Sequence, residues 1–219
     1  MKLYDYSALL FFILSFFGYQ YFYFLAAYKY NRTTRETIIN GYRELWLKKI
    51  IAENQPIIAI QTLRNLIMTG TFLVSLDMLL IGGIASILSS SITFVQSMNV
   101  ISGIDFQTFL LYLHEYPAAL KIFTTIFMLL LSAYNFTIMV RILYNMNFTT
   151  SAALQGDENI QFQLEQIRRQ ARHFITGIRS LYFAIGPLIW LIDTTLMIVF
   201  TAVITISFYR FDFATDRRY

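Results

Sequence analysis

The sequence predicts an all-α integral membrane protein with four transmembrane helices in two parallel repeats and with cytoplasmic amphipathic helices. Three observations predict this fold class. Of the 219 residues, 57% are hydrophobic and only 14% are charged, whereas soluble domains are about a quarter charged. Four segments are apolar over the ~20 residues that a helix needs to cross a bilayer. Finally, motifs of the first half return in the second half at an offset of 115 or 116 residues.

The first predicted span covers residues 7–30, an aromatic-rich apolar run. A cleaved signal peptide is the alternative interpretation, because Ala26 and Ala27 are small residues. Signal peptides, however, have apolar cores of only ~7–15 residues, preceded by basic charge. Here the basic residues follow the apolar run, so we expect a retained membrane anchor.

A polar helix and a second span follow. In residues 34–55 the apolar residues recur at helical spacing and place Trp46 at their edge, which predicts an amphipathic helix lying in the headgroup region. Pro56 ends that helix or opens the next one. The second span, 57–89, would be roughly 50 Å long, so its first turns should project beyond the hydrocarbon core.

The second half is expected to repeat this plan. Residues 90–117 contain no Lys or Arg and are predicted to form an external loop. A third span is expected at 120–144, a second cytoplasmic amphipathic helix at 157–178 and a fourth span at 180–208. The chain would thus be one membrane domain, with a first repeat at 1–89 and a second at 118–219.

The distribution of basic residues predicts the orientation in the membrane. Twelve of the 17 Lys and Arg residues border the two connections between spans one and two and between spans three and four. The positive-inside rule places these connections in the cytoplasm, so both termini are expected outside the cell (inner) membrane. Arg210, Arg217 and Arg218 in the tail oppose this assignment.

Matching positions support the internal repeat. Arg64 corresponds to Arg179, Asp77 to Asp193 and Asn31 to Asn147. Two halves of equal orientation would be related by a pseudo-twofold axis along the membrane normal. Chance similarity between apolar segments is the alternative explanation.

Several motifs also resemble a known family. They are QTLRNLIM (61–68), HFITGIRSLYFAIGPLIW (173–190), NGYRELW (40–46) and the Arg141–Tyr144–Asn145 pattern. The chain is similar, over nearly its whole length, to membrane proteins grouped as domain of unknown function 599. The resemblance implies a four-helix membrane protein and no particular activity. The resemblance also implies that five residues belong to the family motifs and have mainly structural roles: Trp46, Gly177, Tyr182, Pro187 and Trp190. Asp77 and Asp193 depart from the family pattern.

Asp77 and Asp193 are the first candidate functional residues. An ionised carboxylate at mid-bilayer costs about 2.5–3.5 kcal/mol, so it should be protonated, paired or hydrated. Two such carboxylates on equivalent helices could share a proton and form a cation or proton relay. The alternative is a protonated Asp that donates a hydrogen bond to a neighbouring hydroxyl group.

Polar residues at the predicted cytoplasmic ends of the spans are the second group of candidates. They could line a mouth that attracts anions, lipid headgroups or acidic partners. They could equally be anchors whose long side chains reach the phosphates of the membrane surface. The group consists of Gln61, Arg64, Asn65, Arg141 and Arg179.

No catalytic motif or metal-binding motif is present, and the chain contains no Cys. We therefore expect no enzyme activity, no cofactor, no metal and no nucleic-acid partner. The expected partners are the lipid bilayer and either further copies of the chain or other membrane subunits. The leading hypothesis is a small ion or solute channel or transporter acting as a homo-oligomer. The alternative is a non-catalytic accessory or assembly subunit of a larger membrane complex.

Overall fold

The structure is a computed structural model that describes residues 3–29, 34–53, 55–89, 117–152 and 157–213. Within these ranges the chain is helical throughout and contains no strand, which confirms the all-α prediction. The elements are α1 (Leu3–Phe24) with a π-helical turn η1 (Leu25–Lys29), α2 (Arg35–Ala52), α3 (Pro56–Ser89), α6 (Pro117–Ala152), α7 (Asp157–Trp190) and α8 (Thr194–Phe213). Four of these helices are long and apolar enough to cross a membrane, namely α1, α3, α6 and α8.

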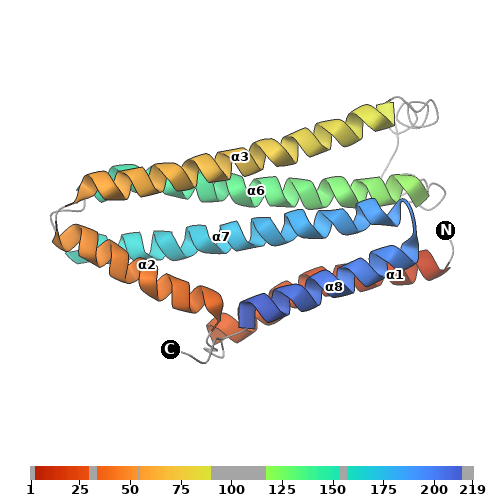
Figure 1. Ribbon diagram of the computed structural model, residues 1–219, viewed down its shortest axis with the longest axis horizontal. Helices are drawn as coiled ribbons and strands as arrows, with labels where there is room; N and C mark the ends of the chain where they lie inside the picture. Colours follow the sequence, from red (N-terminus) through yellow and green to blue (C-terminus); the bar gives the residue numbers. More distant parts are fainter. Residues whose placement is uncertain (1–2, 30–33, 54, 90–116, 153–156, 214–219) are drawn as a thin grey trace.

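The long helices form one elongated bundle (Figure 1). Helix α6 packs against both α3 and α7, and α8 packs against both α7 and α1. Neighbours in the pairs α3–α6, α6–α7 and α7–α8 run antiparallel, whereas α1 and α8 run parallel. Helix α2 lies across one end of the bundle and contacts α3, α7 and α8.

Glycines allow close approach at the two interfaces of α6. A Cβ atom added to Gly177 of α7 would lie 2.7 Å from the Phe136 ring, and one added to Gly70 of α3 would lie 2.6 Å from Val140. Both distances are far below van der Waals contact, so only glycine fits at these positions without repacking.

The predicted fourth span, 180–208, is wrong as a single helix. Helix α7 continues without a break from the polar segment through Arg179 to Trp190, and the chain reverses at Leu191–Asp193 before α8 begins. Pro187 removes a hydrogen-bond donor within the last turns of α7. The Asp193 carboxylate then accepts from the backbone N–H of Leu196 at 3.0 Å and caps α8.

This reversal corrects the expectation that both termini lie on the same side. Near the start of α1, Asp5 accepts a hydrogen bond from Thr194 at the start of α8. At the other end, the rings of Phe22 and Phe213 lie 5.7 Å apart. The start of α1 and the end of α8 therefore lie at opposite ends of the bundle (Figure 1).

The structure does not confirm the two repeats. The polar helix and the span of the first half are separate helices, α2 and α3, whereas their counterparts in the second half form the single helix α7. Asp77 lies within a helix, but Asp193 lies in a turn. The predicted external loop, 90–117, lies outside the described residues except for Pro117, the first residue of α6.

The structure does not confirm the predicted amphipathic pattern of helix α2. Its buried residues are Glu36, Leu47 and Ile50, while Ile38, Ile39, Tyr42 and Leu45 of the predicted apolar side are exposed. In α7, by contrast, Leu164, Ile167 and Ala171 are buried as the periodicity indicated.

Two apolar clusters form the core. One cluster includes Phe12, Phe183 and Trp190, near the start of α1. The other includes Leu47, Phe136 and Leu164, towards α2. Polar residues lie between them, and we call this group the polar layer: the half-buried Gln20 and the buried Asp77, Ser132, Asn135, Arg179 and Asp212. Polar groups that are buried in this way require hydrogen-bonding partners or water.

Candidate functional site

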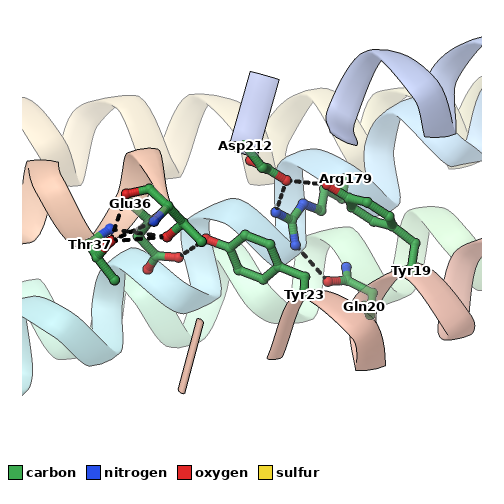
Figure 2. A network of polar contacts seen from close by, with 8 residues as sticks. Tyr19, Gln20, Tyr23, Glu36, Thr37, Arg179 and Asp212 are labelled. Atoms are coloured by element: carbon green, nitrogen blue, oxygen red, sulfur yellow. Dashed lines mark hydrogen bonds and ion pairs between the residues drawn. The ribbon is translucent and has the colours of Figure 1, made fainter. Parts of the chain in front are cut away.

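Arg179 of α7 is the centre of the candidate site. It is only 2% exposed and forms an ion pair with Asp212 near the end of α8. Its Nη1 donates to Gln20 Oε1 of α1 at 2.9 Å, and its guanidinium lies 3.9 Å from the centre of the Tyr23 ring. Figure 2 shows this network, in which Tyr19 also donates to Asp212. Residues of α1 and α8 therefore surround one buried cation of α7.

Glu36 extends the network to α2. The Tyr23 hydroxyl group of α1 donates to Glu36 Oε2, which lies one residue into α2. The start of α2 is held by a capping box, in which Thr34 N–H donates to Thr37 Oγ1 at 2.8 Å and Thr37 N–H donates to Thr34 Oγ1 at 3.3 Å. The capping box fixes the backbone from which Glu36 reaches Tyr23.

A cavity of about 320 Å³ adjoins this network. It lies between α1, the start of α2, α6 and α7, and its polar lining consists of Gln20, Tyr23, Glu36, Arg172, Thr176 and Arg179. Two buried atoms of the lining, Gln20 Nε2 and Glu36 Oε1, make no hydrogen bond within the described residues. The first is a donor and the second is an acceptor, and both belong to residues that line the cavity.

A second cavity, of about 370 Å³, lies on the α2–α8 side of the same residues. Glu36, Ile175 and Arg179 line both cavities. Arg35 lies 4.2 Å from the centre of the Phe211 ring and helps to hold α2 against the end of α8. Glu36 and Arg179 thus lie between the two cavities, and the start of α2 contributes to the lining of both.

Asp77 lies apart from these cavities, in the interface between α3 and α6. It is fully buried, and neither carboxyl oxygen has a hydrogen-bond partner among the described residues. The Ser132 hydroxyl group faces this carboxyl group but donates to the Gly177 carbonyl at 3.0 Å. Asp77 therefore lies in a tightly packed interface, away from the Arg179 network.

Asp193 is exposed and belongs to the turn before α8. The hydrogen bond from Leu196 N–H holds the pKa of its carboxyl group below the usual range. Asp77 and Asp193 thus occupy different environments on different kinds of segment, and the structure does not bring them together as a relay pair.

We expect Asp193 to act as a helix cap with a measurable pH dependence. Its lowered pKa means that the ionised form stabilises the fold above the unfolded pKa of about 3.9, and that this contribution is lost as the pH falls through the lower folded value. Asp193→Ala should lower the unfolding temperature at neutral pH. Asp193→Asn, which also caps helices, should keep it at neutral pH but remove the acid-dependent part. Equal unfolding temperatures for all three proteins at neutral pH would contradict the capping role.

The other predicted polar residues are dispersed. Gln61, Arg64 and Asn65 are exposed on α3, and Arg141 is exposed on α6, whereas Arg179 is enclosed by the bundle. A common cytoplasmic mouth formed by Arg64, Arg141 and Arg179 is therefore not found in the described part of the chain.

The family-pattern residues lie at packing positions, with one exception. Trp46 is half-buried beside the second apolar cluster, Gly177 contacts Phe136, and Trp190 is fully buried. The backbone carbonyl of Trp190 accepts from Lys121 Nζ at 2.8 Å, which ties the end of α7 to α6. Tyr182 is the exception, because it is 48% exposed.

Sequence reasoning missed Tyr19, Tyr23, Glu36 and Asp212. Two signals could have identified them. Tyr19, Gln20 and Tyr23 lie on one side of a helix, and the residues Asp193–Thr194–Thr195 have the composition of a helix start. A new helix at Thr194 would have placed Asp212 inside α8 rather than in a tail.

The comparisons with known proteins identify a family and no activity. A family model described as "Protein of unknown function, DUF599" matches residues 7–217, which confirms the resemblance seen in the sequence motifs. No curated protein and no solved structure matches the chain.

Proposed function

Because the chain belongs to this family of proteins of unknown function, its activity has to be inferred from its own side chains, and we propose that it is a small solute transporter or channel. The proposed binding site is the cavity beside Arg179. The observation that carries the proposal is the pair of unpartnered buried atoms, Gln20 Nε2 and Glu36 Oε1, at a cavity of about 320 Å³.

Energetics support a ligand at this place. A buried polar group without a partner costs about 1–3 kcal/mol, so a small molecule that reached both atoms would remove this cost twice. Ionisable groups buried within membrane helices commonly mark the paths of substrates and ions. Here the buried ion pair Arg179–Asp212 adjoins the cavity.

The two unpartnered atoms favour a solute that carries both a cationic or N–H donor group and an acceptor group, and the apolar lining around them, which includes Phe16, Phe17 and Leu131, suits a small solute with apolar surface as well. The donor would pair with Glu36 and the acceptor with Gln20. Arg179 is already paired with Asp212, so its charge is balanced without the solute. A zwitterion such as a small amino acid has the required pattern. The proposal includes no catalytic step and no cofactor.

The distribution of charge supports an orientation in the cell membrane. With the reversal at Leu191–Asp193, the end of α8 with Arg210 lies at the same end of the bundle as the basic helix α2. Arg210, one of the three residues that opposed the predicted topology, now agrees with the positive-inside rule. We therefore propose a cytoplasmic α2 end, with the start of α1 outside.

A homo-oligomer is part of the proposal. Helix α3 is the least buried of the four candidate spans, with 11% of its apolar window buried, and Phe72 and Leu79 are exposed on it. The same surface favours the second candidate function, a non-catalytic accessory subunit that packs α3 against another membrane protein. Because the exposed surface of α3 fits both candidate functions, the transport measurement has to distinguish the transporter from the accessory subunit.

The test is osmotic swelling of proteoliposomes measured by light scattering, with glycine, glycerol and potassium chloride as the osmolytes. We expect swelling in glycine that exceeds that of empty vesicles. Gln20→Ala combined with Glu36→Gln should lower the rate about tenfold, because each lost hydrogen bond contributes about 0.5–1.5 kcal/mol.

Asp77→Asn and Asp193→Asn are the matched controls and should keep the wild-type rate, because neither residue lines the cavity. A rate that falls with these variants and not with the Gln20 and Glu36 variant would place the transport site at Asp77 and Asp193 instead. Folded protein with no flux in any osmolyte would refute the transport function and leave the accessory role.

A further inference from the structure

A basic groove between α6 and α7 is a separate feature of the bundle. It measures about 720 Å³ and lies on the exposed side of the two helices. Its polar lining comes from Arg141, Asn145 and Thr149 of α6 and from Gln166 and Arg169 of α7. Nothing in the proposed transport function uses these residues.

The two arginines of this groove have no acidic partner among the described residues. Within the described residues neither Arg141 nor Arg169 forms an ion pair, and the residues that line the groove include no carboxylate. By contrast, the neighbouring Arg168 is paired with Glu44, and Arg179 is paired with Asp212. The groove thus carries two uncompensated positive charges beside two side-chain amides, a donor set that suits an oxyanion.

The depth of the groove favours a membrane lipid as the source of that oxyanion. Arg141 follows Ala118, the start of the apolar span in α6, by 23 residues, which is roughly 34 Å of helix. Arg169 precedes Trp190, the end of α7, by 21 residues, roughly 31 Å of helix. With a hydrocarbon core about 30 Å thick that begins at Ala118 of α6 and at Trp190 of α7, both guanidinium groups would lie near the level of the phosphates on the α2 side.

The groove also offers apolar surface on the membrane side of the arginines. Ile138 lines the groove about one turn from Arg141 on the hydrocarbon side, and Ile142 lines it directly beside Arg141. Phe148 and Phe162 line its other end and are 64% and 50% exposed. A molecule with an acyl chain near Ile138 and a charged headgroup along Asn145 and Gln166 would contact both kinds of surface.

We propose that this groove binds the phosphate group of an anionic phospholipid, with Arg141 and Arg169 as the ligands. Arginine forms paired N–H···O contacts with phosphate oxygens, and basic pockets between membrane helices on the cytoplasmic side bind anionic headgroups. The site is independent of the Arg179 cavity, so its failure would leave the proposed transport function untouched.

Native mass spectrometry of the purified full-length protein tests this proposal. The probes are phosphatidylglycerol, zwitterionic phosphatidylcholine and inorganic phosphate. We expect the protein to bind phosphatidylglycerol about tenfold more tightly than phosphatidylcholine, since each basic residue near a membrane surface adds a modest attraction to anionic lipid. Arg141→Gln with Arg169→Gln should abolish this preference.

Lys48→Gln with Lys49→Gln is the matched control, because it removes the same charge from exposed positions on α2. The control should keep the preference for phosphatidylglycerol. Equal loss in both double variants would mean general charge attraction and would overturn the site. Equal binding of the two lipids by the wild type, or displacement of phosphatidylglycerol by inorganic phosphate at matched concentration, would overturn the lipid assignment.

Discussion

Arg179→Met is expected to destabilise the protein by about 3–5 kcal/mol, because it leaves a buried carboxylate without its cation. Asp212 is 7% exposed, and its other partner is the Tyr19 hydroxyl group. One hydroxyl donor does not compensate a charge at this depth. The measurement is the free energy of unfolding of the purified protein in detergent, monitored by the loss of helical signal in denaturant.

A double variant distinguishes the ion pair from simple loss of packing. Arg179→Met with Asp212→Leu removes both charges and should recover much of the stability, since replacing a whole buried pair by apolar residues is often neutral. Arg168→Met, which breaks the more exposed pair with Glu44, should cost less than about 1 kcal/mol. A double variant no more stable than Arg179→Met would show that the charges are not the cause.

Gly177→Ala is expected to cost about 1–3 kcal/mol, the usual range for overpacking a core. The added Cβ atom would lie 2.7 Å from the Phe136 ring, and the Ser132 hydroxyl group donates to the carbonyl of the same glycine. Helices α6 and α7 would have to separate at the point where the polar layer crosses between them. The same unfolding measurement reports this loss.

Gly82→Ala is the matched control for this prediction. It lies in α3, and a Cβ atom there would meet nothing within 4 Å, so stability should be unchanged or slightly raised by the better helix propensity of alanine. Phe136→Leu combined with Gly177→Ala should restore part of the loss by vacating the space of the ring. Equal stability of the wild type and Gly177→Ala would contradict close packing at this interface.

Local features of the sequence were sufficient for most of the helices. The apolar runs of α1, α3 and α6 are long enough to cross a membrane. Pro56 opens α3, as the tolerance of proline in the first turn of a helix implies. The family motifs were recognisable because they are contiguous in sequence.

The candidate site was not predictable in the same way. Tyr19 and Asp212 are separated by 193 residues and meet only because α1 and α8 pack in parallel. Glu36 appears in the sequence as an ordinary first-turn acid of a helix, yet it is buried against Tyr23. Such contacts depend on which helices are neighbours, and single-sequence periodicity does not specify neighbours.

Asp193 shows how one misplaced boundary altered the whole topology. Treating 180–208 as one helix put Asp193 at mid-membrane and both termini on one side. The actual turn at Leu191–Asp193 makes Asp193 a cap and moves the end of α8 to the opposite end of the bundle.

By itself the sequence determined the all-α class, three of the four apolar spans and the family, because these follow from composition, length and local motifs. Only the tertiary structure decided which charges are buried, which are paired and which face a cavity. The reason is physical: the state of Arg179, Asp77 or Arg141 depends on the groups that other helices bring within a few ångströms, and those groups lie far away along the chain.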